Sequence, residues 1–137
     1  MELNNVSIDI LDHPIKDFRR QVRNWTETVE TLDLTNPILV RMLNDQMMEV
    51  EKAFLTPFGL PLQNSTNHVL FSARGSSHHG KVNFPGIINL LEEFDNLPTD
   101  DERQGWTEGW EKLRRHVTEI YVFIKQASSI LKPHHIV

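Results

Sequence analysis

The sequence predicts an all-α domain, a four-helix bundle-like fold with a long irregular loop between its second and third helices. Apolar residues recur at steps of three and four along most of the chain, which is the spacing of one face of an α-helix. Residues 57–84 break this pattern with Gly, Pro, Ser and Asn, which are typical of turns and loops. At 137 residues the chain can bury a core of its own, so a single domain over residues 1–137 is expected.

The first helix is expected from Pro14 to Leu32, with Asp12 as its N-cap and the proline in its first turn. Its apolar residues fall on one stripe and its charged residues cover the rest, which indicates a helix with one face on a core. The stripe consists of Ile15, Phe18, Val22, Trp25, Val29 and Leu32.

The second helix is expected from Pro37 to Phe54, because Asn36 is a good N-cap and proline favours the first helical position. Apolar residues cover more than one face of this helix. Such a helix is buried at the centre of a fold or lies at a subunit interface. The residues expected in the core or in a dimer contact, two of them on the last helix, are Met42, Met47, Val50, Phe54, Ile120 and Ile124.

The third and fourth helices follow the long loop. The third is expected from Pro85 to Phe94 with Asn83 as its cap, and the fourth begins near Asp100. Gly105 and Gly109 weaken the first turns of the fourth helix, so a break is expected there. Beyond them, apolar residues step by four and three and form a bundle seam of Leu113, Val117, Ile120, Ile124, Ala127 and Leu131.

Charge and composition exclude several classes of function. The net charge is -5 and basic residues are mixed with acidic ones, so nucleic acid is not an expected partner. The chain has no cysteine, which excludes disulfides and thiolate metal sites. No run of 18 apolar residues is present and the first residues lack a signal-peptide pattern. Direct membrane insertion is therefore not expected, and no targeting signal is seen in this chain.

The histidines and serines of the loop are the remaining candidates for chemistry. The chain has 7 histidines, and His78 and His79 are adjacent, but no Asp or Glu lies between Leu55 and Leu91. The spacing of a zinc site such as HExxH is absent, so no metal ligands are expected, and a histidine-based metal binder stays a third hypothesis. The loop serines lack the G-x-S-x-G setting of a nucleophile, so no catalytic residue is expected.

Three N-x-[ST] sequons make Asn5, Asn24 and Asn64 candidates for glycosylation. Sequons in this number favour an extracellular location. Unused sequons in an intracellular protein are the alternative.

An ordered series of short motifs lies between Asn36 and Leu91. In chain order they read NPI, RM, NDQ, AF, PFGLP, HV and FPGI. This series resembles the transferrin receptor-like dimerisation domain, the C-terminal helical domain of glutamate carboxypeptidase II and its relatives. The last helix, with Trp110 leading its apolar seam, fits the same family, so the resemblance covers nearly the whole chain.

The resemblance implies a homodimerisation domain in the extracellular part of a type II membrane protein. Its partners would be a second copy of the chain and the protease-like and apical domains of the parent polypeptide. The resemblance also implies that two zinc ions and the catalytic glutamate belong to the protease-like domain, which is absent here. This chain alone would hold no cofactor and would not be an enzyme, while its loop over residues 57–84 would help to line the substrate pocket.

The tip of the loop departs from the family pattern. Glutamate carboxypeptidase II has a Lys-Tyr pair that contacts the glutamate side of its substrate, and an ungapped count places His78 and His79 at those positions. An alignment on Ser-Ser-His makes Lys81 the nearest cation instead. The candidates for pocket lining are therefore Ser77, His78, His79 and Lys81, with a solvated loop tip as the alternative.

Two classes of function remain open from the sequence. The first is the dimerisation and pocket-completing domain of a zinc peptidase-like protein, whose parent is either a peptidase or a receptor. The second is a free-standing helical protein-interaction module with no connection to a peptidase.

Overall fold

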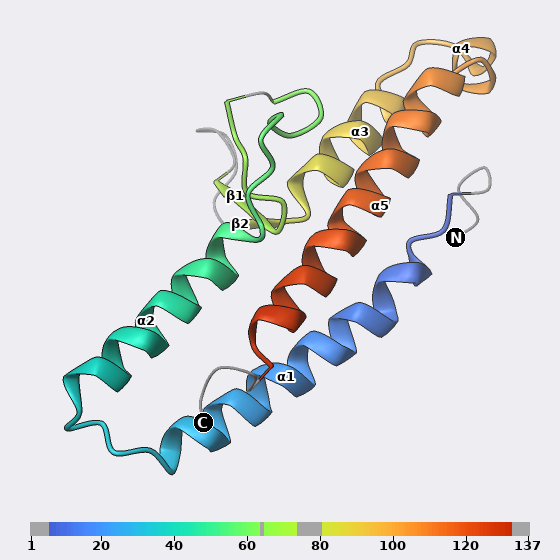
Figure 1. Ribbon diagram of the computed structural model, residues 1–137. Helices are drawn as coiled ribbons and strands as arrows, with labels where there is room; N and C mark the ends of the chain where they lie inside the picture. Colours follow the sequence, from blue (N-terminus) through green and yellow to red (C-terminus); the bar gives the residue numbers. More distant parts are fainter. Residues whose placement is uncertain (1–5, 64, 74–80, 133–137) are drawn as a thin grey trace. The chain divides into compact units, whose positions relative to one another are not determined.

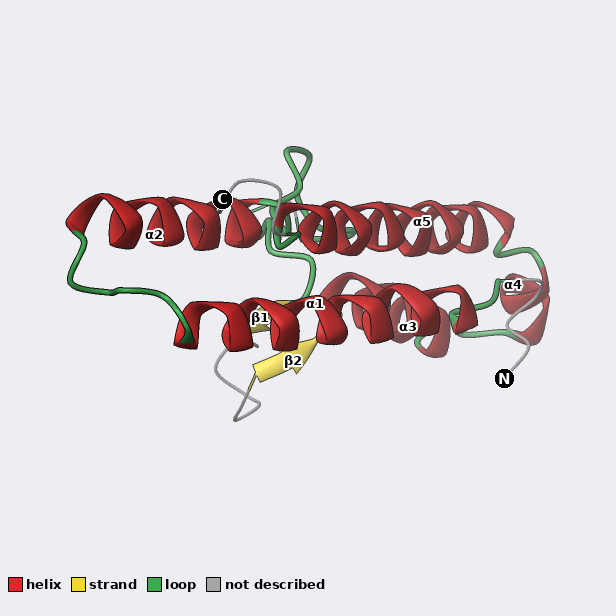
Figure 2. Ribbon diagram, turned by 60° about the horizontal axis from the view of Figure 1, so that its bottom comes forward, coloured by secondary structure: helices red, strands yellow, loops and turns green. Residues whose placement is uncertain are grey.

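The computed structural model describes residues 6–63, 65–73 and 81–132 (Figure 1). Helices dominate this part of the chain, and β1 and β2 are the two short strands in it (Figure 2). The all-α class is therefore confirmed. In chain order the elements are a short 3-10 helix (Asp9–Leu11), α1 (Asp12–Glu30), α2 (Pro37–Lys52), β1 (Phe71–Ala73), β2 (Lys81–Asn83), α3 (Pro85–Asp95), α4 (Asp100–Gln104) and α5 (Thr107–Ile130).

The chain forms two compact units. The helical unit comprises residues 10–54 together with the chain from residue 121 onwards. The loop unit comprises residues 55–120 together with the chain up to residue 9. Helix α5 supplies residues to both units.

The two helices of the helical unit begin in different ways. Asn36 caps α2 as predicted, because its Oδ1 accepts the backbone N–H groups of Ile38 at 3.0 Å and Leu39 at 3.4 Å. The prediction that Asp12 caps α1 is wrong. Asp12 is the first helical residue, and Leu11 stands at the cap position without a side-chain hydrogen bond. An acid in the first turn still stabilises α1, through the positive end of the helix dipole.

Gln46 joins three helices of the helical unit. Its Oε1 accepts the indole N–H of Trp25 on α1 at 2.8 Å, and its Nε2 donates to the carbonyl of Ile130 on α5 at 2.9 Å. The second bond satisfies one of the last carbonyls of α5, which have no partner within their own helix. Phe18 and Phe54 add an edge-to-face contact between ring centroids 5.6 Å apart.

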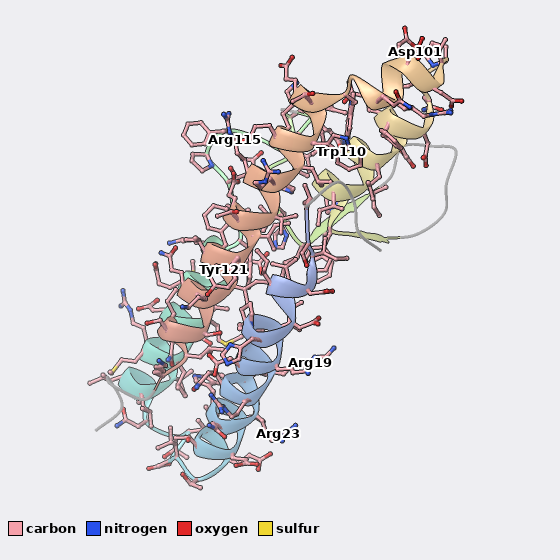
Figure 3. All side chains as sticks on the ribbon, turned by 90° about the vertical axis from the view of Figure 1, so that its right-hand side faces the viewer. Arg19, Arg23, Asp101, Trp110, Arg115 and Tyr121 are labelled. Atoms are coloured by element: carbon pink, nitrogen blue, oxygen red, sulfur yellow. The ribbon has the colours of Figure 1, made fainter. Side chains whose placement is uncertain are left out.

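The predicted stripe of α1 is only partly covered. Its residues are half-buried except Val22, which is 39% exposed. The seam of α5 is confirmed, because every one of its residues is at most 4% exposed: Leu113, Val117, Ile120, Ile124, Ala127 and Leu131. The charged residues Arg19 and Arg23 extend from α1 into solvent, as expected for its polar face (Figure 3).

The long loop is less irregular than predicted. Strands β1 and β2 pair antiparallel, with Phe71 opposite Asn83 and Ala73 opposite Lys81. The pairing continues to the N–H of Phe84, which donates to the carbonyl of Leu70 at 3.0 Å. The prediction that Asn83 caps α3 is wrong, because this residue lies within β2. Phe84 holds the cap position with a left-handed φ of 52° and no side-chain cap bond.

The predicted break in the last helix is confirmed, and it falls between α4 and α5. Thr99 caps α4 by accepting the N–H of Glu102 at 3.2 Å. Three aromatic rings then pack together, with centroids of Phe94, Trp106 and Trp110 at 5.0 to 5.3 Å from one another. Gly109 is required at this point, because a Cβ there would lie 1.9 Å from the ring of Trp106.

A second close approach joins α3 to α5. A Cβ on Gly86 would lie 2.2 Å from Nε2 of His116, so the imidazole packs directly on the backbone of α3. His116 is 3% exposed, and its Nε2 has no hydrogen-bond partner among the described residues. Burial lowers the pKa of His116 to about 4, because the charged imidazolium would lose its hydration there.

We expect Gln46→Leu to destabilise the protein by about 1–3 kcal/mol, because the substitution leaves the Trp25 N–H and the Ile130 carbonyl without their partner. Urea unfolding measures the effect. Gln126→Leu on the exposed face of α5 is the matched control, with an expected change within about 0.5 kcal/mol. Equal effects of the two variants would show that the Gln46 hydrogen bonds do not hold the three helices together.

The buried His116 predicts a loss of stability in acid. Its pKa is lower in the folded protein than in the unfolded chain, so protons bind the unfolded chain first as the pH falls below about 6.5. Stability is therefore full above this pH and declines towards pH 4, by about 2 kcal/mol between pH 7 and pH 5. Urea unfolding at the two pH values measures the decline, and His116→Gln should remove this part of it. An unchanged pH dependence in the variant would contradict the prediction.

Candidate functional site

The exposed apolar side chains of α2 form the first candidate surface. Ile38 is 71% exposed and Met42 is 44% exposed, although both belong to a helix that also carries the buried Leu43 and Val50. Ile38 and Met42 are four residues apart and therefore share one face of the helix. We call these two residues the α2 patch. Exposed apolar residues that adjoin in this way mark an interaction surface better than isolated ones do.

The structure separates the six residues that were expected in the core or in a dimer contact. Val50, Phe54, Ile120 and Ile124 are at most 7% exposed and belong to the core. Met42 and Met47 are each 44% exposed and are available to a partner. These two methionines project about 140° apart around α2. A partner with a flat surface would therefore contact one of them and not both.

The second candidate surface is the loop, whose base is tied down by hydrogen bonds. The N–H of Thr56 donates to the carbonyl of Asn67 at 2.9 Å, and Leu55 forms an isolated antiparallel bridge with His68. Nδ1 of His68 accepts the N–H groups of Leu70 and Phe71, each at 3.2 Å. The buried Val69, at 0% exposed, fixes the same segment to the interior.

Among the predicted pocket residues, Lys81 lies within the described part of the chain. Lys81 is the first residue of β2, where its backbone pairs with Ala73. Ser77, His78 and His79 fall outside the described residues. The hairpin therefore provides a paired stem for the tip, and the role of the tip in a substrate pocket stays a prediction.

Other predicted sites are distributed as follows. Asn24 is exposed on α1, whereas Asn5 and Asn64 lie outside the described residues. The described part of the chain holds no group of three or more His, Asp or Glu side chains that could bind a metal ion. No helix of this part is both long and apolar enough to cross a membrane.

Sequence reasoning missed three polar side chains that organise the structure. Gln46 joins α1, α2 and α5, His68 accepts two backbone N–H groups at the base of the hairpin, and Asn89 donates to the carbonyl of Pro61 at 3.1 Å. A sequence signal was present for Gln46 and His68, because these residues stand in the NDQ and HV motifs. Asn89 stands within the apolar first part of α3, residues 85–91, where a single amide suggests a buried partner.

Comparison with known proteins gives one family and several relatives. The model of the transferrin receptor-like dimerisation domain matches residues 6–132. Aminopeptidase NAALADL1 of Mus musculus is 27% identical over 135 residues, which are 97% of this chain and 17% of that relative. Probable glutamate carboxypeptidase LAMP1 of Arabidopsis thaliana is 22% identical over 129 residues, which are 94% of this chain and 18% of that relative.

Glutamate carboxypeptidase 2 homolog of Caenorhabditis elegans is 31% identical over 65 residues, which are 47% of this chain and 8% of that relative. The chain thus spans less than a fifth of the length of these relatives. The family match, in contrast, runs through both units and includes every helix and strand described above. The chain therefore belongs to the family of transferrin receptor-like dimerisation domains.

Proposed function

We propose that this chain forms a homodimer through the α2 patch, as the dimerisation domain of a longer glutamate carboxypeptidase-like polypeptide. The observation that carries the proposal is the exposure of Ile38 and Met42 on a helix that also carries the buried Leu43 and Val50. The family description, a dimerisation domain, suggests contact between two copies of the chain. The relatives are much longer and are named as peptidases, which suggests a peptidase-like parent polypeptide.

The chemistry of the α2 patch suits self-association. A two-fold contact places the same surface of both copies face to face, so an apolar surface meets an apolar surface. Methionine adapts its shape to a partner because its side chain is unbranched and flexible. Ile38 supplies a stiffer branched side chain on the same face. A specific dimer buries about 1,200–2,000 Å² in all, so neighbouring residues must join the patch in the contact.

We expect Met42→Glu to weaken the dimer at least about tenfold, because the new carboxylates of the two copies would be buried close together without a counter-ion. Sedimentation equilibrium on the purified chain measures the dissociation constant. Asn44→Glu is the matched control, since it adds the same charge to an exposed position that projects about 160° away from Met42.

Two results would contradict this proposal. A strictly monomeric chain at tens of micromolar would favour the free-standing interaction module over a dimerisation domain. A dimer that is weakened equally by Met42→Glu and by Asn44→Glu would show that self-association does not use the α2 patch.

The loop tip is the second part of the proposal. We infer that the β1–β2 hairpin carries the tip towards the substrate pocket of a protease-like domain with two zinc ions in the parent polypeptide. The anchored base at His68 and the paired stem support this inference, because a loop that positions substrate must be held rigidly. The side chains of the tip would then contact the substrate, while the zinc ligands belong to the other domain.

In a polypeptide that contains both domains, we expect replacement of His78 and His79 by alanine to raise KM several-fold and to leave the zinc content unchanged. The tip would contribute to substrate binding rather than to the chemical step, so kcat should change little. Steady-state kinetics and metal analysis measure the two quantities. Ser65→Ala, an exposed residue of the same loop outside the tip, is the control. A fall in kcat at constant KM would contradict the pocket-lining role.

We place this domain on the extracellular side of the membrane in the parent polypeptide. The exposed sequon at Asn24 supports this placement, because the transferase requires an accessible asparagine. Mass spectrometry of the protein from secreting eukaryotic cells gives the test, and an unmodified Asn24 there would count against the placement.

A further inference from the structure

A cleft of about 350 Å³ lies within the loop unit. One wall is the turn over residues 58–62, and the other is a single face of α5. Lys112, Arg115 and Glu119 of that face line the cleft at successive helical turns, together with His116. Sites for small ligands and short peptide segments begin at about this volume.

The turn is held in place before any ligand arrives. The N–H of Leu60 donates to the carbonyl of Thr66 at 2.8 Å, and Leu60 itself is buried at 1% exposed. From α3, the amide of Asn89 donates to the carbonyl of Pro61 at 3.1 Å and to Oε1 of Gln63 at 3.4 Å. A wall fixed by this many bonds loses little entropy on binding, which favours affinity.

The turn exposes two large apolar side chains. Phe58 is 84% exposed and Leu62 is 54% exposed, and both line the cleft. Leu62 also adopts a left-handed φ of 64°, which is uncommon for any residue other than glycine and costs energy. Strained backbone of this kind persists where the surrounding structure enforces it and is concentrated at binding sites.

The helix side of the cleft offers charge and an unused acceptor. Arg115 lies on α5 with its side chain 78% exposed (Figure 3). Among the described residues, Nε of Arg115 forms a long ion pair with Oε1 of Glu111 at 3.9 Å. Arg114 pairs with the same carboxylate. Oε1 of Glu119 is buried without a hydrogen-bond partner among the described residues.

A second copy of the chain is a poor occupant of this cleft. A two-fold contact through it would bring Lys112 and Arg115 close to the same cations of the other copy. Like charges that face each other at an interface oppose binding. Lys112 already pairs with Glu108 at 3.5 Å, whereas the pair of Arg115 with Glu111 is long at 3.9 Å, so Arg115 is the cation that complements a carboxylate of a ligand.

We propose that this cleft binds an extended peptide segment of a partner protein in which apolar side chains alternate with carboxylates. An apolar side chain of the segment sits between Phe58 and Leu62. A carboxylate bonds to the guanidinium of Arg115, a geometry that arginine favours.

Fluorescence anisotropy with the labelled peptide Leu-Asp-Leu-Asp-Leu, capped at its C-terminus, tests this proposal on the full chain. We expect saturable binding to the 137-residue protein and about tenfold weaker binding of the matched peptide with Asn in place of Asp. Arg115→Ala should weaken binding of the acidic peptide about tenfold. Arg114→Ala, at the preceding position of the helix and outside the lining of the cleft, should leave the affinity unchanged.

Leu62→Gly distinguishes a loss of peptide binding from a loss of stability. Glycine relieves the left-handed φ and removes the apolar side chain, so the variant should be at least as stable as the parent and bind the peptide more weakly. Absence of saturable binding, or equal affinity for the Asp and Asn peptides, would overturn the proposal. It would also fail if Arg115→Ala or Leu62→Gly shifted the monomer–dimer equilibrium, because the occupant would then be a second copy.

Discussion

One apolar stripe along α5 is the constraint on which the rest of the structure depends. Its six residues, from Leu113 to Leu131, are spaced by four and three and are at most 4% exposed. Residues 113–120 of the stripe belong to the loop unit and residues 124–131 to the helical unit. A single inserted residue would turn every later position by about 100° and expose the remainder of the stripe. The two units thus depend on one uninterrupted helical register.

Much of the fold could be predicted, because its helices obey local rules. Asn36 followed by proline specifies the start of α2, and the stripe of α5 follows from its spacing alone. Phe84 shows where local rules fail. The side chain of Asn83 is better suited to capping, but the backbone of Asn83 is paired within β2. Phe84 therefore occupies the cap position, with a strained φ of 52°. Pairing of β2 with β1, 8 to 12 residues earlier in the chain, decided the outcome, and the side-chain chemistry of Asn83 does not report it.

The candidate surfaces were only partly predictable for a related reason. The sequence shows that α2 is apolar on several sides, but not which side lies on the core. The structure places Leu43 and Val50 inside and leaves Ile38 and Met42 exposed. The cleft was not predictable at all, because its two walls are separated by about fifty residues and its cations look like an ordinary solvated face. The bonding partners of Gln46 and Asn89 were not predictable either, because each partner is far away in sequence, although Gln46 itself stands in the NDQ motif.

The two exposed apolar surfaces differ in a way that assigns them different partners. The α2 patch consists of an isoleucine and a methionine, whereas the cleft combines apolar side chains with Arg115, Lys112 and an unpaired carboxylate oxygen. A two-fold contact favours the first kind of surface, because a surface that meets itself gains nothing from a net charge. A cationic cleft gains affinity and specificity only from a partner of opposite charge. In our two proposals, α2 therefore serves self-association and the cleft serves a different polypeptide.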